Sequence, residues 1–436
     1  MALTGRTALI AALGALVVGL LLPSWAGIGA VTGPLLLAVL ADLALAAPVR
    51  SLVLTRTGDT SVRLGEPATV ELTVTNPSRR PLRAHLRDAW PPSAWRPGTA
   101  VPGSRHRLTV PAGERRRVTT HLLPTRRGDH HAHRVTVRSH GPLGLAARQG
   151  AHRLPWTLRA LPPFASRKHL PSRLARLREL DGRTSILTRG QGTEFDSLRE
   201  YLPGDDVRSI DWRASARRHT VAVRTWRPER DRHVLIVLDT GRTSAGRVGD
   251  APRLDAALDA ALLLAALATK AGDRVDLLAH DSHKRRSVVG RSASDVLPAF
   301  TEAMATLEPA LVQTDLRALT SATLRLAPHR SLIVLLTGLD AGPVEEGLLP
   351  QLPLLTKRHE VVLASVADPR LDELATTRGT VQDVYAAAAA EQTRADRART
   401  AALLTRRGVT VLDAPPAALP PALADTYLAL KAAGRL

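Results

Sequence analysis

Hydrophobic and polar positions change their spacing twice along the chain, and each change marks a different kind of structure. Residues 1–49 contain two long apolar stretches, residues 50–160 alternate apolar and polar positions, and residues 161–436 combine continuous apolar runs with helical repeats. These patterns are typical of membrane helices, half-buried strands and an α/β domain. We therefore predict two transmembrane helices, then a β-sandwich-like domain, then an α/β domain.

The two apolar stretches predict a helical hairpin in a membrane. The first starts at Thr7, a PSWAG turn follows, and the second runs from Ile28 to Ala47. Each approaches the ~20 residues that span a bilayer, although the first is somewhat short. A cleaved signal peptide is the alternative, but a second apolar segment follows where polar mature sequence is expected. Asp42 lies late in the second stretch, where it is expected to reach the interface or a partner helix.

Charges next to the hairpin predict its orientation. Arg6 precedes it, Arg50 and Arg56 follow it, and the turn between the two stretches has no lysine or arginine. Positive residues flanking membrane helices favour the cytoplasmic side. We therefore expect a multi-pass protein of the plasma membrane whose N-terminus and main domains are cytoplasmic.

The middle part alternates with period two, as in ATVELTVTN, and breaks at Asn76 and Pro77. Several short strands joined by Pro and Gly turns predict a β-sandwich. His130, His131 and His133 suggest a metal site at first sight. Neighbouring strand residues point to opposite faces, however, and an exposed strand edge is the interpretation we favour.

The C-terminal part predicts a doubly wound, mostly parallel sheet. RHVLIVLDTG is a continuous apolar run, as in a strand buried on both faces, and a helical pattern that stops at glycine follows it. Further strands and helices alternate to the end of the chain. Binding sites in such sheets form at the carboxyl ends of the strands.

Oxygen-bearing side chains recur at these predicted strand ends. Asp239 and Asp340 end two strands, Thr243 follows Asp239 by four positions, and a QTDL loop offers Thr314 and Asp315. Such residues would form an all-oxygen cage of the kind that Mg²⁺ prefers. The arrangement resembles the metal-ion-dependent adhesion site of von Willebrand factor type A domains. The predicted metal ligands are Asp239, Thr243, Thr314 and Asp340.

One position departs from the adhesion-site pattern. Gly241 stands where that pattern has its first hydroxyl residue, and Arg242 adds a positive charge beside the predicted cage. Losing a hydroxyl ligand weakens metal binding, although water commonly completes the Mg²⁺ shell. Asp239 and Asp340 would, without a metal, cap the turns that follow their strands.

A dense charged stretch, EFDSLREYLPGDDVRSIDWRASARR, precedes the Asp239 strand. It holds six carboxylates and five arginines. Phe195, Leu198 and Tyr201 recur at helical spacing and are expected to dock on the sheet, with Asp205 as the cap of a short helix. The VAVRTW segment after it is expected to add an edge strand. Bidentate arginine–carboxylate pairs would then fix the geometry of this insert.

This stretch closely resembles the signature of the domain-of-unknown-function fifty-eight (DUF58) family. The matching positions are Glu194, Phe195, Arg199, Tyr201, Pro203, Gly204, Asp205, Arg208, Asp211, Trp212 and Arg217. Two membrane helices and a β domain ending in GPLGL also match the family's usual layout. The resemblance implies a von Willebrand type A-like domain and a MoxR-type AAA+ ATPase as partner. It implies a membrane-anchored adaptor in chaperone-like assembly or an envelope-related function.

Two interpretations of the signature residues stay open: a structural clamp, or a partner-binding surface whose buried ion pairs serve recognition. An enzyme is the weaker hypothesis, because no phosphate loop, nucleophile elbow or zinc-protease motif occurs. Glu194 and Asp211 as an acid–base pair are disfavoured, because nearby arginines would lower their pKa values. A metal-dependent hydrolase using the Asp239 and Asp340 end of the sheet is the alternative function.

Composition limits these hypotheses further. The net charge of +20 favours anionic partners, but no basic stripe interleaved with aromatics occurs, so a nearby anionic membrane is preferred to nucleic acid. The basic residues are spread along the chain. The chain has no cysteine, which excludes disulfides, thiolate metal sites and cysteine nucleophiles.

Overall fold

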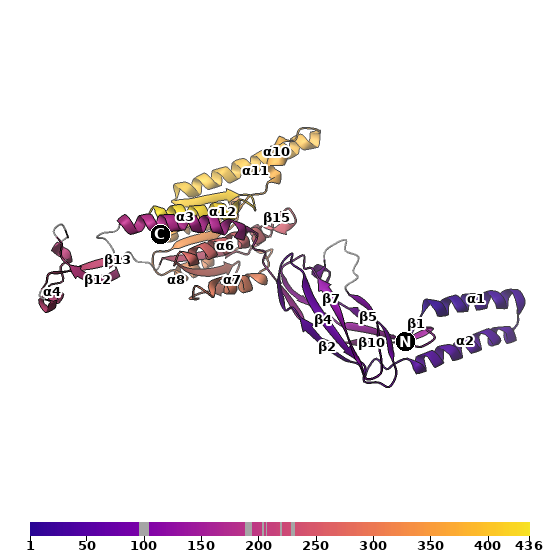
Figure 1. Ribbon diagram of the computed structural model, residues 1–436. Coiled ribbons are helices and arrows are strands. Elements are labelled where there is room, and N and C mark those ends of the chain that lie inside the picture. The colour runs from indigo at the N-terminus through magenta and orange to yellow at the C-terminus, as the bar shows by residue number, and fades with distance from the viewer. Residues whose placement is uncertain (96–103, 188–193, 203–204, 206, 219, 228–231) are drawn as a thin grey trace. The chain divides into compact units, whose positions relative to one another are not determined.

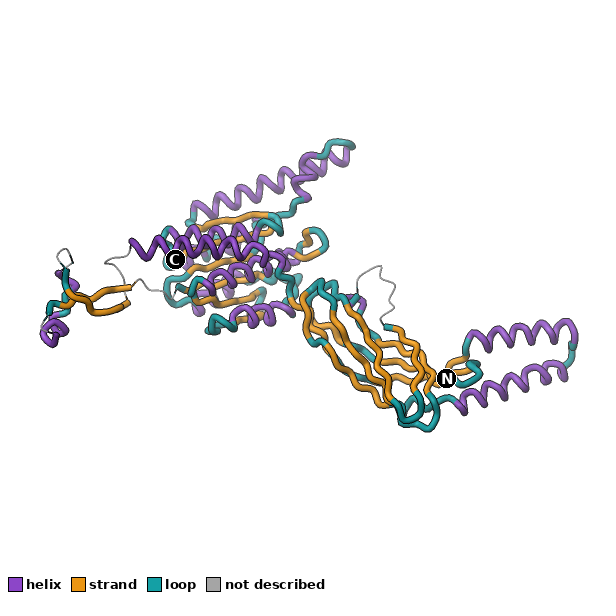
Figure 2. Tube along the Cα trace, in the orientation of Figure 1, coloured by secondary structure: helices purple, strands orange, loops and turns teal. Residues whose placement is uncertain are grey.

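The structure is a computed structural model that describes residues 1–95, 104–187, 194–202, 205, 207–218, 220–227 and 232–436 (Figure 1). The chain forms two compact units, Met1–Pro163 and Phe164–Leu436. The first combines a helical hairpin with β-strands, and the second alternates strands and helices (Figure 2).

The first unit begins with a hairpin of helices α1 (Gly5–Leu21) and α2 (Trp25–Leu45). Both helices are apolar all round, and the Ser24 hydroxyl accepts a hydrogen bond from the Gly27 amide at the start of α2. Within the described residues, α2 has the length and composition to cross a membrane, and α1 is shorter at 17 residues. A membrane anchor and a signal sequence share these properties. The structure therefore supports one helix of membrane-spanning length where the sequence pattern predicted two.

Two sheets of the first unit pack face to face over one apolar core, which confirms the predicted β-sandwich-like domain. The five-stranded sheet has the order β1 (Ala2–Leu3), β10 (Ala146–His152), β9 (Val135–His140), β5 (Leu82–Asp88) and β6 (Arg105–Val110). The opposing sheet has the order β2 (Val53–Gly58), β4 (Ala68–Thr75) and β7 (Arg115–Leu122). Strict alternation places Leu72 and Val74 of β4 against Leu82 and Leu86 of β5.

A third small sheet has the order β3 (Ser61–Arg63), β11 (Thr157–Leu161) and β8 (Gly128–His131). His130 of β8 is buried, and its ring nitrogens bond the Ser93 hydroxyl at 3.1 Å and the Arg126 carbonyl at 2.9 Å. The exposed strand edge predicted for the histidines is therefore wrong for His130, because its ring fills a polar niche inside the unit.

The second unit is built on a six-stranded sheet whose pairs are all parallel except the β17–β18 edge. The order is β18 (Lys284–Val288), β17 (Arg274–His280), β14 (His233–Asp239), β19 (Leu332–Leu336), β20 (Glu360–Val366) and β21 (Val409–Ala414). The central strands are apolar throughout because both faces are covered. The mostly parallel α/β architecture predicted from the sequence is confirmed.

Helices cover both faces of this sheet (Figure 1). One face packs against α3 (Leu170–Leu187), α6 (Arg253–Lys270), α7 (Val296–Ala305) and α12 (Leu419–Ala432). The other packs against α8 (Leu316–Leu326), the π-helical turn η4 (Pro343–Leu348), α9 (Leu352–Thr356) and α11 (Val381–Arg406). The remaining short elements are η1 (Pro92–Ala94), η2 (Ala165–His169), α5 (Arg242–Ala245), β15 (Arg247–Val248), β16 (Ala251–Pro252) and α10 (Arg370–Thr376).

The charged stretch forms an antiparallel pair of its own, β12 (Glu194–Glu200) with β13 (Ala222–Arg227), joined through η3 (Val207–Ser209) and α4 (Trp212–Arg218). We call Glu194–Arg227 the signature insert. The helix predicted from the spacing of Phe195, Leu198 and Tyr201 is wrong, because this segment is largely strand β12. The predicted edge strand is also wrong, since β13 pairs with β12 and not with the six-stranded sheet.

Candidate functional site

The sheet of the second unit has a point where the strand order reverses. From β14 the chain crosses to β17 on one side, and it later returns to β19 on the other side of β14. Crossovers on either side leave the carboxyl ends of β14 and β19 open to ligands. Asp239 is the last residue of β14, and Thr337 directly follows β19.

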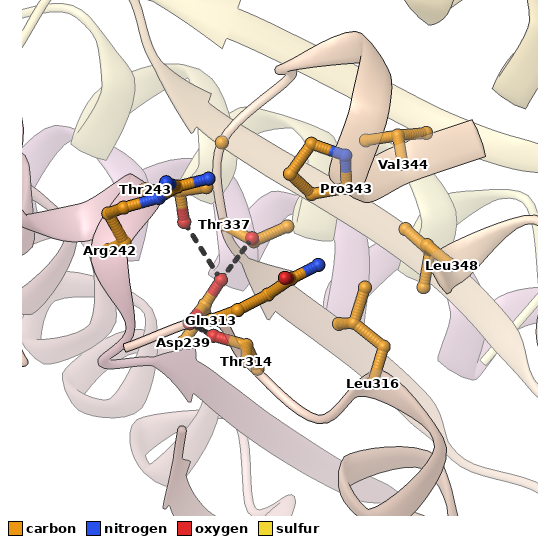
Figure 3. A pocket seen from close by; sticks show the side chains of 11 residues that line it. Asp239, Arg242, Thr243, Gln313, Thr314, Leu316, Thr337, Pro343, Val344 and Leu348 are labelled. Carbon is orange, nitrogen blue, oxygen red and sulfur yellow. Dashed lines mark hydrogen bonds between the residues drawn. The ribbon is translucent and has the colours of Figure 1, made fainter. Parts of the chain in front are cut away.

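The Asp239 carboxylate accepts four hydrogen bonds, and Figure 3 shows the three threonines that donate to it. Its Oδ1 accepts from the Gly241 amide at 2.8 Å and the Thr314 hydroxyl at 2.5 Å. Its Oδ2 accepts from the Thr243 hydroxyl at 3.0 Å and the Thr337 hydroxyl at 2.6 Å. Three loops that are distant in sequence therefore converge on one acid. We call Thr243, Thr314 and Thr337 the threonine ring.

Burial makes these bonds necessary. Asp239 is 2% exposed, and an acid removed from water is costly unless hydrogen bonds replace its hydration. Each threonine gives its single proton to the carboxylate. Its oxygen keeps acceptor lone pairs, because a hydroxyl has one proton and two lone pairs. The ring thus shields the charge of Asp239 and still offers oxygen ligands.

Gly241 determines how close Thr314 comes to Asp239. A Cβ at position 241 would lie 2.1 Å from the Thr314 Oγ1 and 3.1 Å from the Asp239 Oδ1. A side chain at position 241 would therefore compete for space with the Thr314 hydroxyl.

A pocket opens over the threonine ring (Figure 3). Its wall is apolar on one side, formed by Leu316, Pro343, Val344 and Leu348, and its other side carries Arg242. Arg242 is exposed, and its guanidinium has no ion pair with a described residue. The pocket therefore combines oxygen ligands, an apolar wall and one cation.

The predicted ligand set is brought together only in part. Asp239, Thr243 and Thr314 are in direct contact. The Asp340 carboxylate is 44% exposed, and the Arg253 guanidinium lies 3.9 Å from it. Asp315 caps α8 by accepting from the Ala318 amide at 2.9 Å.

The residues fit a hard cation in one respect only. The donor set is all oxygen, as Mg²⁺ prefers, but it contains one buried carboxylate and three hydroxyls, so water would have to fill much of the shell. Among the described residues, no group of three or more histidine, cysteine or acidic side chains is placed to hold a metal ion. Arg242 places a positive charge beside these oxygen ligands.

Sequence analysis missed two residues that build this site. Thr337 stands directly after a buried strand, and this strand-end position is the feature of the sequence that could have identified it. Asp281 follows β17, and its carbonyl accepts from the Asp315 amide at 3.0 Å, which holds the loop that carries Thr314. Burial raises the pKa of Asp281, but the His283 amide and the Arg285 charge outweigh it and hold the pKa below its usual value.

The signature insert has its own polar anchors. Arg199 makes a bidentate pair with Asp205 at 2.7 and 2.5 Å, and this hydrogen bond raises the pKa of Arg199. Asp211, not the predicted Asp205, caps α4, because its Oδ1 accepts from the Arg213 and Ala214 amides at 3.1 and 3.0 Å. Asp205 instead closes the turn after β12 by accepting from the Leu202 amide.

Apolar side chains on the signature insert are exposed. Trp212 is 68% exposed, and Leu202 and Val207 are each 61% exposed. Arg208 and Arg217 are also exposed, and Tyr201 is half-buried. The backbone positions of Glu194 and Phe195 lie in β12, and Pro203 and Gly204 lie outside the described residues.

Comparison with known families identifies the second unit. Residues 197–407 match the sequence model of the family described as "Protein of unknown function DUF58". This part of the chain matches the DUF58 family. The match includes β13, all of the threonine ring and most of the six-stranded sheet. The predicted family is thereby confirmed, and the Asp239 site lies inside the DUF58 domain.

Relatives of the DUF58 domain carry no assigned activity in their names. An uncharacterized protein of Mycobacterium tuberculosis (strain H37Rv) is 29% identical over 187 residues, which is 42% of this chain and 58% of the relative. The uncharacterized protein YeaD of Bacillus subtilis is 28% identical over 113 residues, which is 26% of this chain and 28% of YeaD. The chain thus spans little more than half the length of the mycobacterial relative.

Solved structures are more distant. The CARDB domain of a Pyrococcus furiosus protein is 12% identical with a TM-score of 0.19, covering 25% of this chain and 87% of that chain. The PapD-like domain of human CEP192 is 16% identical with a TM-score of 0.17, covering 24% and 84%. Scores of this size support no argument, so the two-sheet arrangement rests on its own strand pairing.

Proposed function

We propose that this chain is a membrane-anchored docking protein whose DUF58 domain binds a protein partner over the threonine ring. The partner class we propose is a MoxR-type AAA+ ATPase, which comes from the family resemblance. In this proposal the chain is an adaptor in chaperone-like assembly or an envelope-related function, and it has no catalytic activity of its own.

The observation that carries the proposal is the saturation of Asp239 by three threonine hydroxyls and one amide. An acid–base catalyst needs a carboxylate free to exchange a proton with a substrate. Asp239 has both oxygens engaged and is buried. A rigid ring of hydroxyl oxygens beside an apolar wall suits recognition, which needs fixed geometry and shape.

A magnesium ion is part of the proposal for this site. Thr243, Thr314 and Thr337 would hold it through their free lone pairs, with Asp239 behind them and water completing the shell. When bound, the ion would supply a positive charge that binds a carboxylate of the partner. Asp340 would contribute through water, because its carboxylate lies near Thr243 but is partly exposed beside Arg253.

The finer parts of the architecture belong to the same proposal. We propose that the DUF58 domain has the von Willebrand type A-like fold, which the strand order and the Asp239 position support. We also propose that α1 and α2 both cross the plasma membrane and that both units lie in the cytoplasm. The arginines flanking the hairpin support this orientation.

A metal-dependent hydrolase at the Asp239 and Asp340 end of the sheet is the alternative function. No observation favours it over docking, because Asp340 is partly exposed beside Arg253 and Asp239 is fully hydrogen-bonded. Metal-dependent turnover that is lost in Asp239→Ala would establish it.

The test is a capture of partners from detergent-solubilised membranes. Wild type, Asp239→Ala and the control Asp383→Ala are compared, each with Mg²⁺ and with EDTA, and bound proteins are identified by mass spectrometry. Asp383 is a partly exposed acid in the capping box of α11, so its loss removes the same charge at a residue that does not line the pocket.

We expect a MoxR-type ATPase with wild type and Asp383→Ala in Mg²⁺, and a loss of at least ~10-fold with Asp239→Ala or EDTA. Equal capture in all samples would overturn the Asp239 site and would favour the exposed Trp212 surface of the signature insert. Absence of the ATPase from every sample would overturn the adaptor function.

A further inference from the structure

The five-stranded sheet of the first unit has an outer face that faces away from the core. Leu82, Ala84 and Leu86 of β5 point inward, so the residues between them point outward. The strand register continues this face across β6 and β9. We call it the basic face; its charged and histidine members are Arg83, His85, Arg87, Arg105, Arg107, Arg138 and His140.

The charge of the basic face is unbalanced. Its five arginines are exposed, and none forms an ion pair with a described residue. Arg107 donates to His85 at 2.9 Å and Arg138 donates to Gln149 at 2.7 Å, so the bonds between these side chains involve neutral acceptors. No acidic residue alternates outward on β5, β6, β9 or β10.

The opposing sheet shows that this imbalance is local. The outward positions of β2, β4 and β7 are mostly threonines, and Arg117 there pairs with Glu71 at 3.0 Å. Both faces belong to the same β-sandwich and are drawn from the same arginine-rich chain. The arginine content of the chain therefore does not explain five unpaired arginines on one face only.

One end of the basic face adjoins the end of α2. Arg148 of β10 donates to the Leu43 carbonyl at 2.8 Å, and Arg80, just before β5, donates to the Ala44 carbonyl. His140 is followed by Gly141, and a Cβ on Gly141 would lie 2.1 Å from a carboxylate oxygen of Asp42. The sheet is thus held by short bonds to the helix that has membrane-spanning length.

We propose that the basic face binds the phosphate groups of anionic phospholipids in the membrane that holds α2. Arginine is suited to this role because its planar guanidinium makes paired hydrogen bonds to phosphate. Basic residues near a membrane helix are attracted to an anionic membrane surface. The proposal rests on the membrane anchoring proposed above, and it adds a second contact between the chain and the bilayer.

The occupant is lipid rather than nucleic acid for a physical reason. Single-stranded nucleic acid is bound by aromatic side chains that stack on bases, interleaved with basic residues. The outward positions of this sheet hold arginine, histidine, threonine, glutamine and alanine, with no phenylalanine, tyrosine or tryptophan. Binding to phosphate groups alone, at a surface whose one end adjoins α2, matches this composition.

The test uses the full chain in lipid nanodiscs of phosphatidylcholine, with or without about one-third phosphatidylglycerol. Because the chain has no cysteine, a single label can be placed by Thr109→Cys on the basic face, or by Thr55→Cys on the opposing sheet as the matched control. Thr109 pairs with Arg83 and Thr55 pairs with Thr73, and both are exposed. Quenching of a fluorophore on the cysteine by headgroup-labelled lipid reports how close each face lies to the bilayer.

We expect at least ~3-fold stronger quenching of the Thr109→Cys label with phosphatidylglycerol than without it, and no such change for Thr55→Cys. Adding Arg83→Gln, Arg107→Gln and Arg138→Gln should abolish the increase, whereas Arg115→Gln with Arg117→Gln should not. Equal quenching in both lipids, or an unchanged increase in the triple variant, would overturn the proposal.

Two further readouts separate this proposal from its alternatives. Resistance to carbonate extraction reports whether the chain is membrane-anchored, so a failed anchor is distinguished from a failed basic face. Salt-sensitive retention on DNA that the triple variant loses, without lipid-dependent quenching, would overturn lipid as the occupant in favour of nucleic acid.

Discussion

Asp42 and Asp239 are both buried acids, but they are satisfied by different kinds of donor. Asp42 accepts from the backbone amides of Leu143 at 2.8 Å, Leu145 at 2.7 Å and Ala146 at 2.8 Å. Asp239 accepts from three threonine hydroxyls and one amide. Their exposed fractions, 0% and 2%, do not distinguish them.

The donors indicate which acid serves the fold and which serves binding. A backbone amide N–H donates one proton and has no lone pair that could accept a hydrogen bond or bind a cation. The three amides around Asp42 therefore offer no further group for binding. A threonine hydroxyl that donates to Asp239 still accepts hydrogen bonds or binds a cation. The backbone donors therefore indicate a structural role for Asp42, whereas the spare lone pairs of the threonines make Asp239 a candidate binding site.

The largest effect that tests this comparison is expected from Asp42→Ala. Three amides lose a charged acceptor inside the first unit, which should cost about 3 kcal/mol of its free energy of unfolding. Hydrogen exchange of the amides at 143, 145 and 146 should accelerate on the order of 100-fold in solubilised protein.

Asp59→Ala is the control for this loss, because Asp59 accepts from the Thr69 amide at 2.7 Å at an exposed position. It should change stability by less than about 1 kcal/mol. Equal effects of the two substitutions would contradict the interpretation of Asp42 as a buried acid that stabilises the first unit.

Gly241→Ser is expected to have an intermediate effect on the second unit. The new Cβ must push the Thr314 hydroxyl away from Asp239, and overpacking of this kind typically costs about 1–3 kcal/mol. The serine hydroxyl should recover part of this cost as a new donor, so Gly241→Ala should destabilise more. Thermal unfolding of both variants measures the difference; unchanged melting of both would refute the tight approach of Thr314.

The smallest effect is expected from Thr337→Val. It removes one hydroxyl from Asp239 at nearly constant volume and should cost about 1 kcal/mol. Thr323→Val is the control, because Thr323 is a buried threonine whose hydroxyl donates to the Leu319 carbonyl within α8 and not to Asp239. If only Thr337→Val also weakens partner capture in Mg²⁺, the threonine ring serves binding; equal loss from both variants would make its role structural.

The sequence patterns predicted the second unit well and the signature insert poorly. The β14 and β19 segments are apolar throughout, because a strand that is covered on both faces has no solvent-facing positions for polar side chains. Such a pattern can be recognised from the sequence. Phe195, Leu198 and Tyr201 fit helical spacing by position alone. The segment instead pairs with β13, and such long-range pairing leaves no trace in local spacing.

The candidate site shows the same limit. Asp239, Thr243 and Thr314 could be predicted because they match a known spacing at a strand end. Thr337 could not, because its role depends on β19 returning beside β14, which is a property of topology. Asp340 was predicted as a ligand from its strand-end position, and only the side-chain geometry shows it near Arg253.

The hydrogen bonds of Asp42 also have a consequence for the order of synthesis. Its partners lie 101 to 104 positions later in the chain. When α2 leaves the ribosome, the amides that will neutralise its acid do not yet exist, so the Asp42 carboxylate must keep its water. The last turn of α2 can reach its final position only after about a hundred more residues have been made and the β9–β10 loop has closed over it. The placement of the last turn of α2 is therefore completed by the strands that follow it in the chain.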